Sequence, residues 1–153
     1  NDEFKSFSKL EGREKIKNQF YLIEEFILKE IKNGNKTKPK VFDKNVLIHG
    51  HCHQKSQNRT KGLTQLLNEL NIKNKMIDSS CCGMAGSFGY SSKHYEISKK
   101  MAHLTLIPEI NKSNEQDYIV ANGTSCRHQI SDFSNKKPKH ISELLFNLFE
   151  TIN

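Results

Sequence analysis

Hydrophobic residues follow two periods along the chain. In residues 20–31, 59–70, 91–111 and 141–152 they recur every three or four positions, which is typical of amphipathic helices. A further run of helix-forming residues lies at 8–17. Three short apolar runs, at residues 44–49, 75–78 and 117–121, have the length of buried strands. The pattern therefore predicts strands that alternate with helices.

The predicted helices differ in how they should end. In the helix predicted at 20–31, the apolar stripe consists of Phe20, Ile23, Ile27 and Ile31, with Phe26 beside it. Asn33 and Gly34 should end this helix, and Pro108 should bend or end the helix at 91–111. Residues 136–140 are either a polar approach to the last helix or a short strand.

Strands that alternate with helices favour a parallel sheet, because a crossover helix returns the chain to the same end of the sheet. We expect an α/β fold with a small parallel sheet of three to four strands, helices on both faces, and cysteine loops at the carboxyl ends of the strands. Residues 1–40 are interpreted as a helical amino-terminal extension and residues 41–153 as the α/β domain.

Composition places limits on the class of protein. The chain has 153 residues, a hydrophobic content of 35% and a mean hydropathy of -0.71, and it begins at Asn1 rather than methionine. We therefore expect a piece of a longer protein. It has no apolar leader and no apolar run that would span a membrane. We expect reduced thiols and a cytoplasmic protein, soluble or peripheral to the inner face of the membrane.

The net charge of +7 comes mainly from scattered lysines, while the chain has only three arginines, Arg13, Arg59 and Arg127. A nucleic-acid-binding surface more often shows arginines clustered among aromatic residues. We therefore expect no nucleic-acid partner.

Four cysteines follow the three predicted strands: Cys52 after the first, Cys81 and Cys82 after the second, and Cys126 after the third. The carboxyl ends of parallel strands meet at one edge of a sheet, so these thiols should converge. Gly83 supplies the freedom for a sharp turn after the adjacent pair. The small residues at 84–87 suit a helix start whose amides point at negative charge. A tight turn with two buried thiols that pack as small apolar groups is the alternative for this loop.

Four converging thiolates suit an iron-sulfur cluster or a tetrahedral zinc ion. Structural zinc usually takes two ligands from each of two C-x2-C knuckles, and the chain has no such knuckle. A cluster is therefore favoured, with zinc as a substitute. A zinc-stabilised docking module remains a second hypothesis. A third makes Cys81 or Cys82 a redox-active thiol that forms mixed disulfides.

Polar residues crowd the same loops, and two roles are open to them. His49, His51, His53 and His128 could donate hydrogen bonds to sulfur, carry protons or replace a ligand. Because His49, His51 and His53 alternate along the chain, only one or two of these three are expected to reach the site. Lys55, Arg127 and Thr124 would lower the pKa of a thiol if they face inward, and otherwise lie in solvent.

Three motifs, HGHCHQKS at 49–56, CCGMAGSFGY at 81–90 and GTSCRHQI at 123–130, resemble the cysteine-rich CCG domain. That domain occurs in heterodisulfide reductases, in the iron-sulfur component of glycolate oxidase and in related lactate-utilisation proteins. The chain is most similar to the carboxyl-terminal part of FAD-linked oxidases, which fuse a flavin 2-hydroxyacid dehydrogenase to an iron-sulfur region.

The resemblance implies an electron-transfer domain with a cluster of the 4Fe-4S type. Its implied ligands are Cys52, Cys81, Cys82 and Cys126, in loops that include Gly83 and Gly123. FAD would lie on the parent region, and the partners would be the flavin and ferredoxin-like regions and an electron carrier or quinone pathway. The fragment alone is not expected to be catalytic. Gly123 stands where relatives have the first cysteine of a final C-x2-C, so the five-cysteine non-cubane cluster is in doubt.

Overall fold

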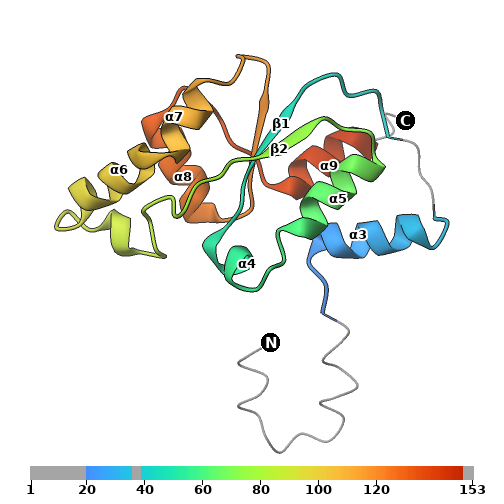
Figure 1. Ribbon diagram of the computed structural model, residues 1–153, viewed down its shortest axis with the longest axis horizontal. Helices are drawn as coiled ribbons and strands as arrows, with labels where there is room; N and C mark the ends of the chain where they lie inside the picture. Colours follow the sequence, from blue (N-terminus) through green and yellow to red (C-terminus); the bar gives the residue numbers. More distant parts are fainter. Residues whose placement is uncertain (1–19, 36–38, 150–153) are drawn as a thin grey trace, which may run out of the picture.

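A computed structural model describes residues 20–35 and 39–149. In this part of the chain, three parallel strands form a sheet in the order β2-β1-β3, with helices on both faces (Figure 1). The strands are β1 (Val46–His49), β2 (Asn74–Met76) and β3 (Tyr118–Ala121). In register, Leu47 of the central strand pairs with Lys75 and with Ile119. The expected α/β class is confirmed.

The described helices are α3 (Ile23–Lys32), α4 (Cys52–Ser56), α5 (Lys61–Glu69), α6 (Tyr95–Leu104), α7 (Leu106–Asn111), α8 (Thr124–Phe133) and α9 (Ile141–Phe149), with a 3-10 turn η1 (Phe88–Tyr90). Three of them, α3, α5 and α6, begin two to four residues later than the patterns predicted. The helix expected at 8–17 and the end of the one expected at 141–152 lie outside the described residues.

The sheet separates two hydrophobic cores, because successive strand side chains point to opposite faces. Val46, Ile48 and Val120 pack with the buried leucines of α5 and α9 and with Leu28 of α3. Leu47, Ile119 and Ala121 pack on the other face with α7, α8 and the cysteine segment. Figure 1 shows the two helix groups on opposite sides of the strands. Every residue of β1 is buried, as expected for the central strand of a covered parallel sheet.

The expected short strand at 136–140 is reduced to a single bridge. Lys139 pairs in parallel with Val120 at the free edge of β3. The Ala121 amide donates to the Lys139 carbonyl over 2.9 Å, and the Lys139 amide donates to the Ile119 carbonyl over 2.8 Å. Pro138 has no amide hydrogen to extend the ladder. The sheet edge is therefore covered at one point only.

The helix expected at 91–111 is interrupted, as Pro108 indicated, and forms two helices, of which the first begins only at Tyr95. Thr105 has the non-helical angles φ -146° and ψ -48° and separates α6 from α7. The ring of Pro108 would collide with the carbonyl of Leu104, four residues earlier, in a continuous helix. The break at Thr105 removes this conflict and lets Leu106, Ile107 and Ile110 become buried.

The first described helix, α3, packs against α5. Its buried residues are Glu24 and Leu28, while Ile27 and Ile31 of the predicted stripe are partly buried against the core. Ile23 is exposed, so the predicted stripe coincides only in part with the face that the fold buries. Arg59, just before α5, forms a bidentate ion pair with Glu25. The division into residues 1–40 and 41–153 stays a prediction.

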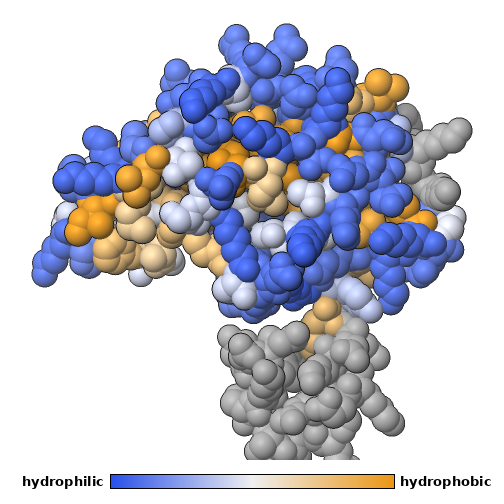
Figure 2. Space-filling model, in the orientation of Figure 1, coloured by the Kyte–Doolittle hydropathy of each residue, from blue (hydrophilic) through white to orange (hydrophobic). Residues whose placement is uncertain are grey.

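The visible surface is mostly hydrophilic (Figure 2). Hydrophobic side chains gather toward the end that carries α6, whose exposed residues include Tyr95, Ile97 and Leu104. Among the residues that the structure describes, no helix combines the length and apolar character needed to cross a bilayer.

Candidate metal centre

The fold places all four cysteines after the carboxyl ends of strands. Cys52 is the first residue of α4 and follows β1. Cys81 and Cys82 lie in the loop after β2, and Cys126 lies in the first turn of α8 after β3. All four are free thiols. The expected position is confirmed, although Cys52 and Cys126 lie in helical turns rather than in loops.

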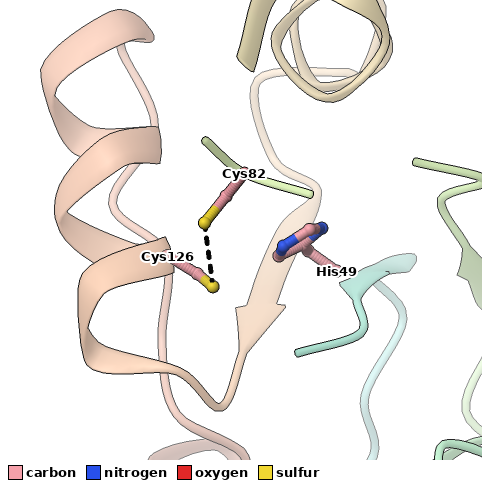
Figure 3. Close-up of side chains that lie close together, drawn as sticks. All are labelled: His49, Cys82 and Cys126. Carbon is pink, nitrogen blue, oxygen red and sulfur yellow. Dashed lines mark hydrogen bonds between the residues drawn. The ribbon is translucent and has the colours of Figure 1, made fainter. Parts of the chain in front are cut away.

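Cys82 and Cys126 form the buried half of this group. Their sulfur atoms are 3.2 Å apart, and each residue is at most 2% exposed (Figure 3). The two sulfurs share a hydrogen bond, which lowers the pKa of Cys82 to about 4 and raises that of Cys126, with burial also acting against ionisation. One thiolate and one thiol is therefore the favoured state of the reduced pair.

Cys52 and Cys81 form the outer half. Cys52 is exposed, and its sulfur lies 4.0 Å from the Ser80 carbonyl oxygen. Desolvation and a hydrogen bond with Cys81 raise the pKa of the Cys52 thiol. The charges of Cys52 and Cys81 both act on Cys126, which also raises its pKa. The four thiols therefore lie near enough to influence one another, although, among the residues that the structure describes, Cys52 and Cys81 are outside the group of metal-ligating atoms that lie within 4.8 Å of one another.

The loop after the cysteine pair directs amides at sulfur. Gly83 has φ +93°, and its amide donates to the Cys81 sulfur over 3.3 Å. The Met84 amide also hydrogen-bonds to Cys82, which helps to lower the pKa of that thiol. The helix start expected at 84–87 is wrong, because this segment is a turn and α6 begins only at Tyr95. Within this segment, the amide of Met84 contacts the Cys82 sulfur.

His49, the last residue of β1, is the histidine that lies at the buried thiols. It is 1% exposed, and one of its ring nitrogens lies with the sulfurs of Cys82 and Cys126 in a group whose members are all within 4.8 Å of one another. The sequence named His49 among four histidines but gave no reason to select it. Its position at the end of a continuous apolar run could have selected it, because every residue of this strand is buried and its last side chain lies beneath the cysteine loops.

The other three histidines lie farther out. His51 is half-buried; burial lowers its pKa, and the charge of Cys82 opposes this effect. His53 is exposed and hydrogen-bonds to Gln57 over 2.6 Å. His128 is also exposed and pairs with the Tyr90 hydroxyl over 2.6 Å. The expectation that one or two histidines reach the site fits His49 and His51.

Three further polar residues organise the backbone around the thiols. Lys55 donates to the carbonyls of Ser79 and Ser80, and its charge favours the Cys52 thiolate, although desolvation has the larger effect on that pKa. Arg127 donates over 2.9 Å to the carbonyls of Ala121 and Asn122 at the end of β3. It also donates to the hydroxyl of Thr124 over 3.3 Å. The roles of Arg127 and Thr124 toward sulfur stay predictions.

Gly123 adjoins the site at its most crowded point. A Cβ on this residue would be 2.9 Å from the Cys126 sulfur and would also collide with the His51 ring. His51 therefore fills the space that a cysteine side chain at position 123 would need. The packing at position 123 thus has no room for the side chain of a fifth cysteine.

An open cleft of about 710 Å³ extends from this point toward α3. His51, Gly123 and Glu24 are among its lining residues. Glu24 is 1% exposed and accepts hydrogen bonds from Gln54 and Asn122. Burial raises the pKa of this carboxyl group. The cleft therefore borders the cysteine edge at His51 and Gly123.

Fold and site together define a parallel α/β domain that gathers free cysteines at the carboxyl ends of its strands. A family model described as CCG, a cysteine-rich domain, matches residues 46–131. This span is more than half of the 153 residues, so the chain belongs to the CCG cysteine-rich domain family.

Two curated relatives are dehydrogenases or parts of one. D-2-hydroxyglutarate dehydrogenase of Pseudomonas putida is 26% identical over 100 residues, which are 64% of this chain and 10% of that protein. One component of the anaerobic glycerol-3-phosphate dehydrogenase of Escherichia coli K12 is 24% identical over 131 residues, 85% of this chain and 33% of that component. The chain thus spans a third or less of these relatives' lengths. No solved structure matches it.

Proposed function

We propose that this chain is an iron-sulfur electron-transfer module of a larger, FAD-linked oxidoreductase that acts on 2-hydroxy acids. Cys52, Cys81, Cys82 and Cys126 would hold a cluster of the 4Fe-4S type. The observation that carries the proposal is that four free thiols from three separate segments follow the carboxyl ends of the strands at one edge of the sheet, with the sulfurs of Cys82 and Cys126 3.2 Å apart. The dehydrogenase relatives support the same class of function.

The residues at this edge fit such a cluster. Thiolates are the ligands that iron-sulfur clusters prefer, and the low pKa of Cys82 supplies one at neutral pH. The amides of Gly83 and Met84 donate to sulfur, and amide donors of this kind stabilise negative charge on thiolate and sulfide. A bound cluster would accept and release single electrons. The protein would hold it, shield its buried side and leave the Cys52 side open to solvent.

The rest of the reaction belongs to the parent protein. FAD on a separate region would oxidise the substrate, and a ferredoxin-like region would connect that flavin with this module. An electron carrier or quinone pathway would take the electrons, with the protein cytoplasmic or peripheral to the inner face of the membrane. The lengths of the relatives are consistent with such a larger context.

Anaerobic reconstitution of the reduced chain with ferrous iron and sulfide tests the proposal. We expect both elements to be retained after desalting, with a broad visible absorption that bleaches on reduction. Iron and sulfide should fall to background when Cys82 and Cys126 are both replaced by serine. Retention of about one zinc ion per chain, with no sulfide under any condition, would instead support the zinc-stabilised docking module.

Thiol alkylation distinguishes the cluster from disulfide exchange. Attack requires a thiolate that solvent can reach. The structure separates these properties, because Cys82 has the low pKa but is 2% exposed, whereas Cys52 is exposed but has a raised pKa. We expect iodoacetamide to modify Cys52 slowly at pH 7, at a rate that still increases above pH 9 because its thiolate fraction is still growing. Mass spectrometry of timed samples measures this rate.

The same reaction in urea serves as the control, since all four thiols of the unfolded chain should react at ordinary rates. One cysteine that is alkylated rapidly at pH 7 in the folded, metal-free chain would contradict this prediction. Such a result would favour the disulfide-exchange function.

A further inference from the structure

The imidazole of His49 is held in a way that leaves one nitrogen without a partner. Nδ1 lies 2.9 Å from the hydroxyl oxygen of Ser79, which is itself 6% exposed. Nε2 is buried and has no hydrogen-bond partner in the described part of the chain. A buried polar atom without a partner costs about 1–3 kcal/mol, so it calls for an explanation.

The surroundings of His49 supply that explanation. Its ring lies beside the sulfurs of Cys82 and Cys126 (Figure 3). The His49 ring also helps to lower the pKa of Cys82. Its Nε2 nevertheless forms no well-formed hydrogen bond to that sulfur. A ring that lies beside two thiols, with one nitrogen fixed by an outer hydroxyl and the other buried without a partner, has the arrangement that metal-binding histidines adopt. Imidazole and thiolate are ligands that iron and zinc accept together.

We propose that His49 binds the metal of this centre directly through Nε2, so that the donor set combines one imidazole with the thiolates of Cys82 and Cys126. The fourth ligand comes from the outer pair, Cys52 or Cys81, so that the imidazole takes the place of one of the four thiolates. The inference rests on the proposed function for the identity of the centre, but not for the existence of a metal site. It adds an imidazole to the four thiols from which the ligands are drawn, in a site where Gly123 supplies no thiol.

A neutral imidazole in place of a thiolate has a functional consequence. It removes one negative charge from the ligand set, which favours the reduced form of an iron-sulfur cluster and raises its reduction potential. Ser79 acts as a positioning residue, because its hydroxyl fixes the ring while Nε2 remains available. The buried strand end would thereby help to set the direction of electron flow into this module.

Anaerobic titration of the reduced chain with Co²⁺ tests the metal site without requiring a cluster. We expect the visible bands of tetrahedral Co²⁺ together with thiolate-to-cobalt charge transfer. His49→Ala should weaken the apparent affinity at least about 100-fold, and Ser79→Ala about 10- to 100-fold. His49→Cys should restore binding and add charge-transfer intensity. His53→Ala is the matched control, because His53 is exposed and bonds to Gln57, and it should bind Co²⁺ like the wild type.

Pulsed electron paramagnetic resonance of the reduced, reconstituted wild-type chain gives a second measurement that needs no substitution. A strong nitrogen-14 coupling from a directly bound imidazole is expected, and it should be absent from His49→Cys. This measurement keeps the inference testable if circular dichroism shows that His49→Ala does not fold. His49→Cys should also have a lower cluster potential than the wild type.

The outcomes separate the two proposals. Retained iron and sulfide without nitrogen coupling, or wild-type Co²⁺ affinity and spectrum in a folded His49→Ala, would overturn the role of His49 and leave the electron-transfer function standing. Binding of Co²⁺ that depends on His49, in a chain that never retains sulfide, would support the ligand role and reject the cluster. A wild-type chain that binds no Co²⁺ and shows no nitrogen coupling also overturns the inference.

Discussion

Replacing Gly83 with alanine should lower the free energy of unfolding of the chain by about 3 kcal/mol. Gly83 has φ +93°, a region that costs an L-residue about 1–2 kcal/mol. A Cβ at this position would also collide with the backbone carbonyl oxygen of Ser98 and lie 3.1 Å from Gln129 Nε2. Backbone cannot move aside as a side-chain end can, so overpacking adds about 1–3 kcal/mol. Urea unfolding of the reduced chain, followed by circular dichroism, measures the change.

Gly86→Ala is the matched control for this prediction. Gly86 lies in the same loop at φ +70°, but a Cβ there would have no neighbour within 4 Å. Its replacement should therefore cost only the backbone term, about 1 kcal/mol. Equal losses for the two variants would show that the approach of the loop to α6 is looser than described. The difference between them isolates the contact with Ser98.

Gln129→Leu should destabilise the chain by about 2–3 kcal/mol and lower the iron retained after reconstitution. Gln129 is 3% exposed on α8, and its Nε2 donates to the carbonyls of Cys82 and Ser98 over 2.9 and 3.2 Å. It also lies 2.8 Å from the Ser98 hydroxyl. Leucine fills a similar volume but leaves buried acceptors unpaired, at about 1–3 kcal/mol each when no water replaces the donor. Because one of these acceptors belongs to Cys82, the ligand loop should lose definition as well as stability.

Gln65→Leu provides the control for Gln129→Leu. Gln65 is exposed on α5, so replacing it with leucine makes the same chemical change without removing a buried hydrogen bond. We expect a change within about 0.5 kcal/mol there and unaltered iron content. A similarly small effect at Gln129 would mean that the amide does not hold the cysteine loop between α6 and α8. Urea unfolding and iron analysis of both variants decide between these results.

The alternation of short apolar runs with helical periods was sufficient to predict the parallel α/β fold and the edge at which the cysteines meet. It succeeded because Val46–His49 and Tyr118–Ala121 are fully or largely buried strands, and buried parallel strands read as continuous apolar runs. The same local reasoning predicted an interruption at Pro108 but did not place it at Thr105. There the chain breaks three residues before Pro108, because the proline acts on the carbonyl four positions behind it.

The sequence by itself determined the kind of chemistry, since four cysteines placed after three strands indicate soft-metal binding in this fold. Only the tertiary structure divided those cysteines into a buried pair and an outer pair, and only it singled out His49 from the other histidines near the motifs. Residue order fixes which side chains follow a strand. Three features depend instead on how separate segments pack around one another, which no local pattern records. They are the burial of Cys82 and Cys126, the contact between Ser79 and His49, and the unpartnered Nε2 of His49.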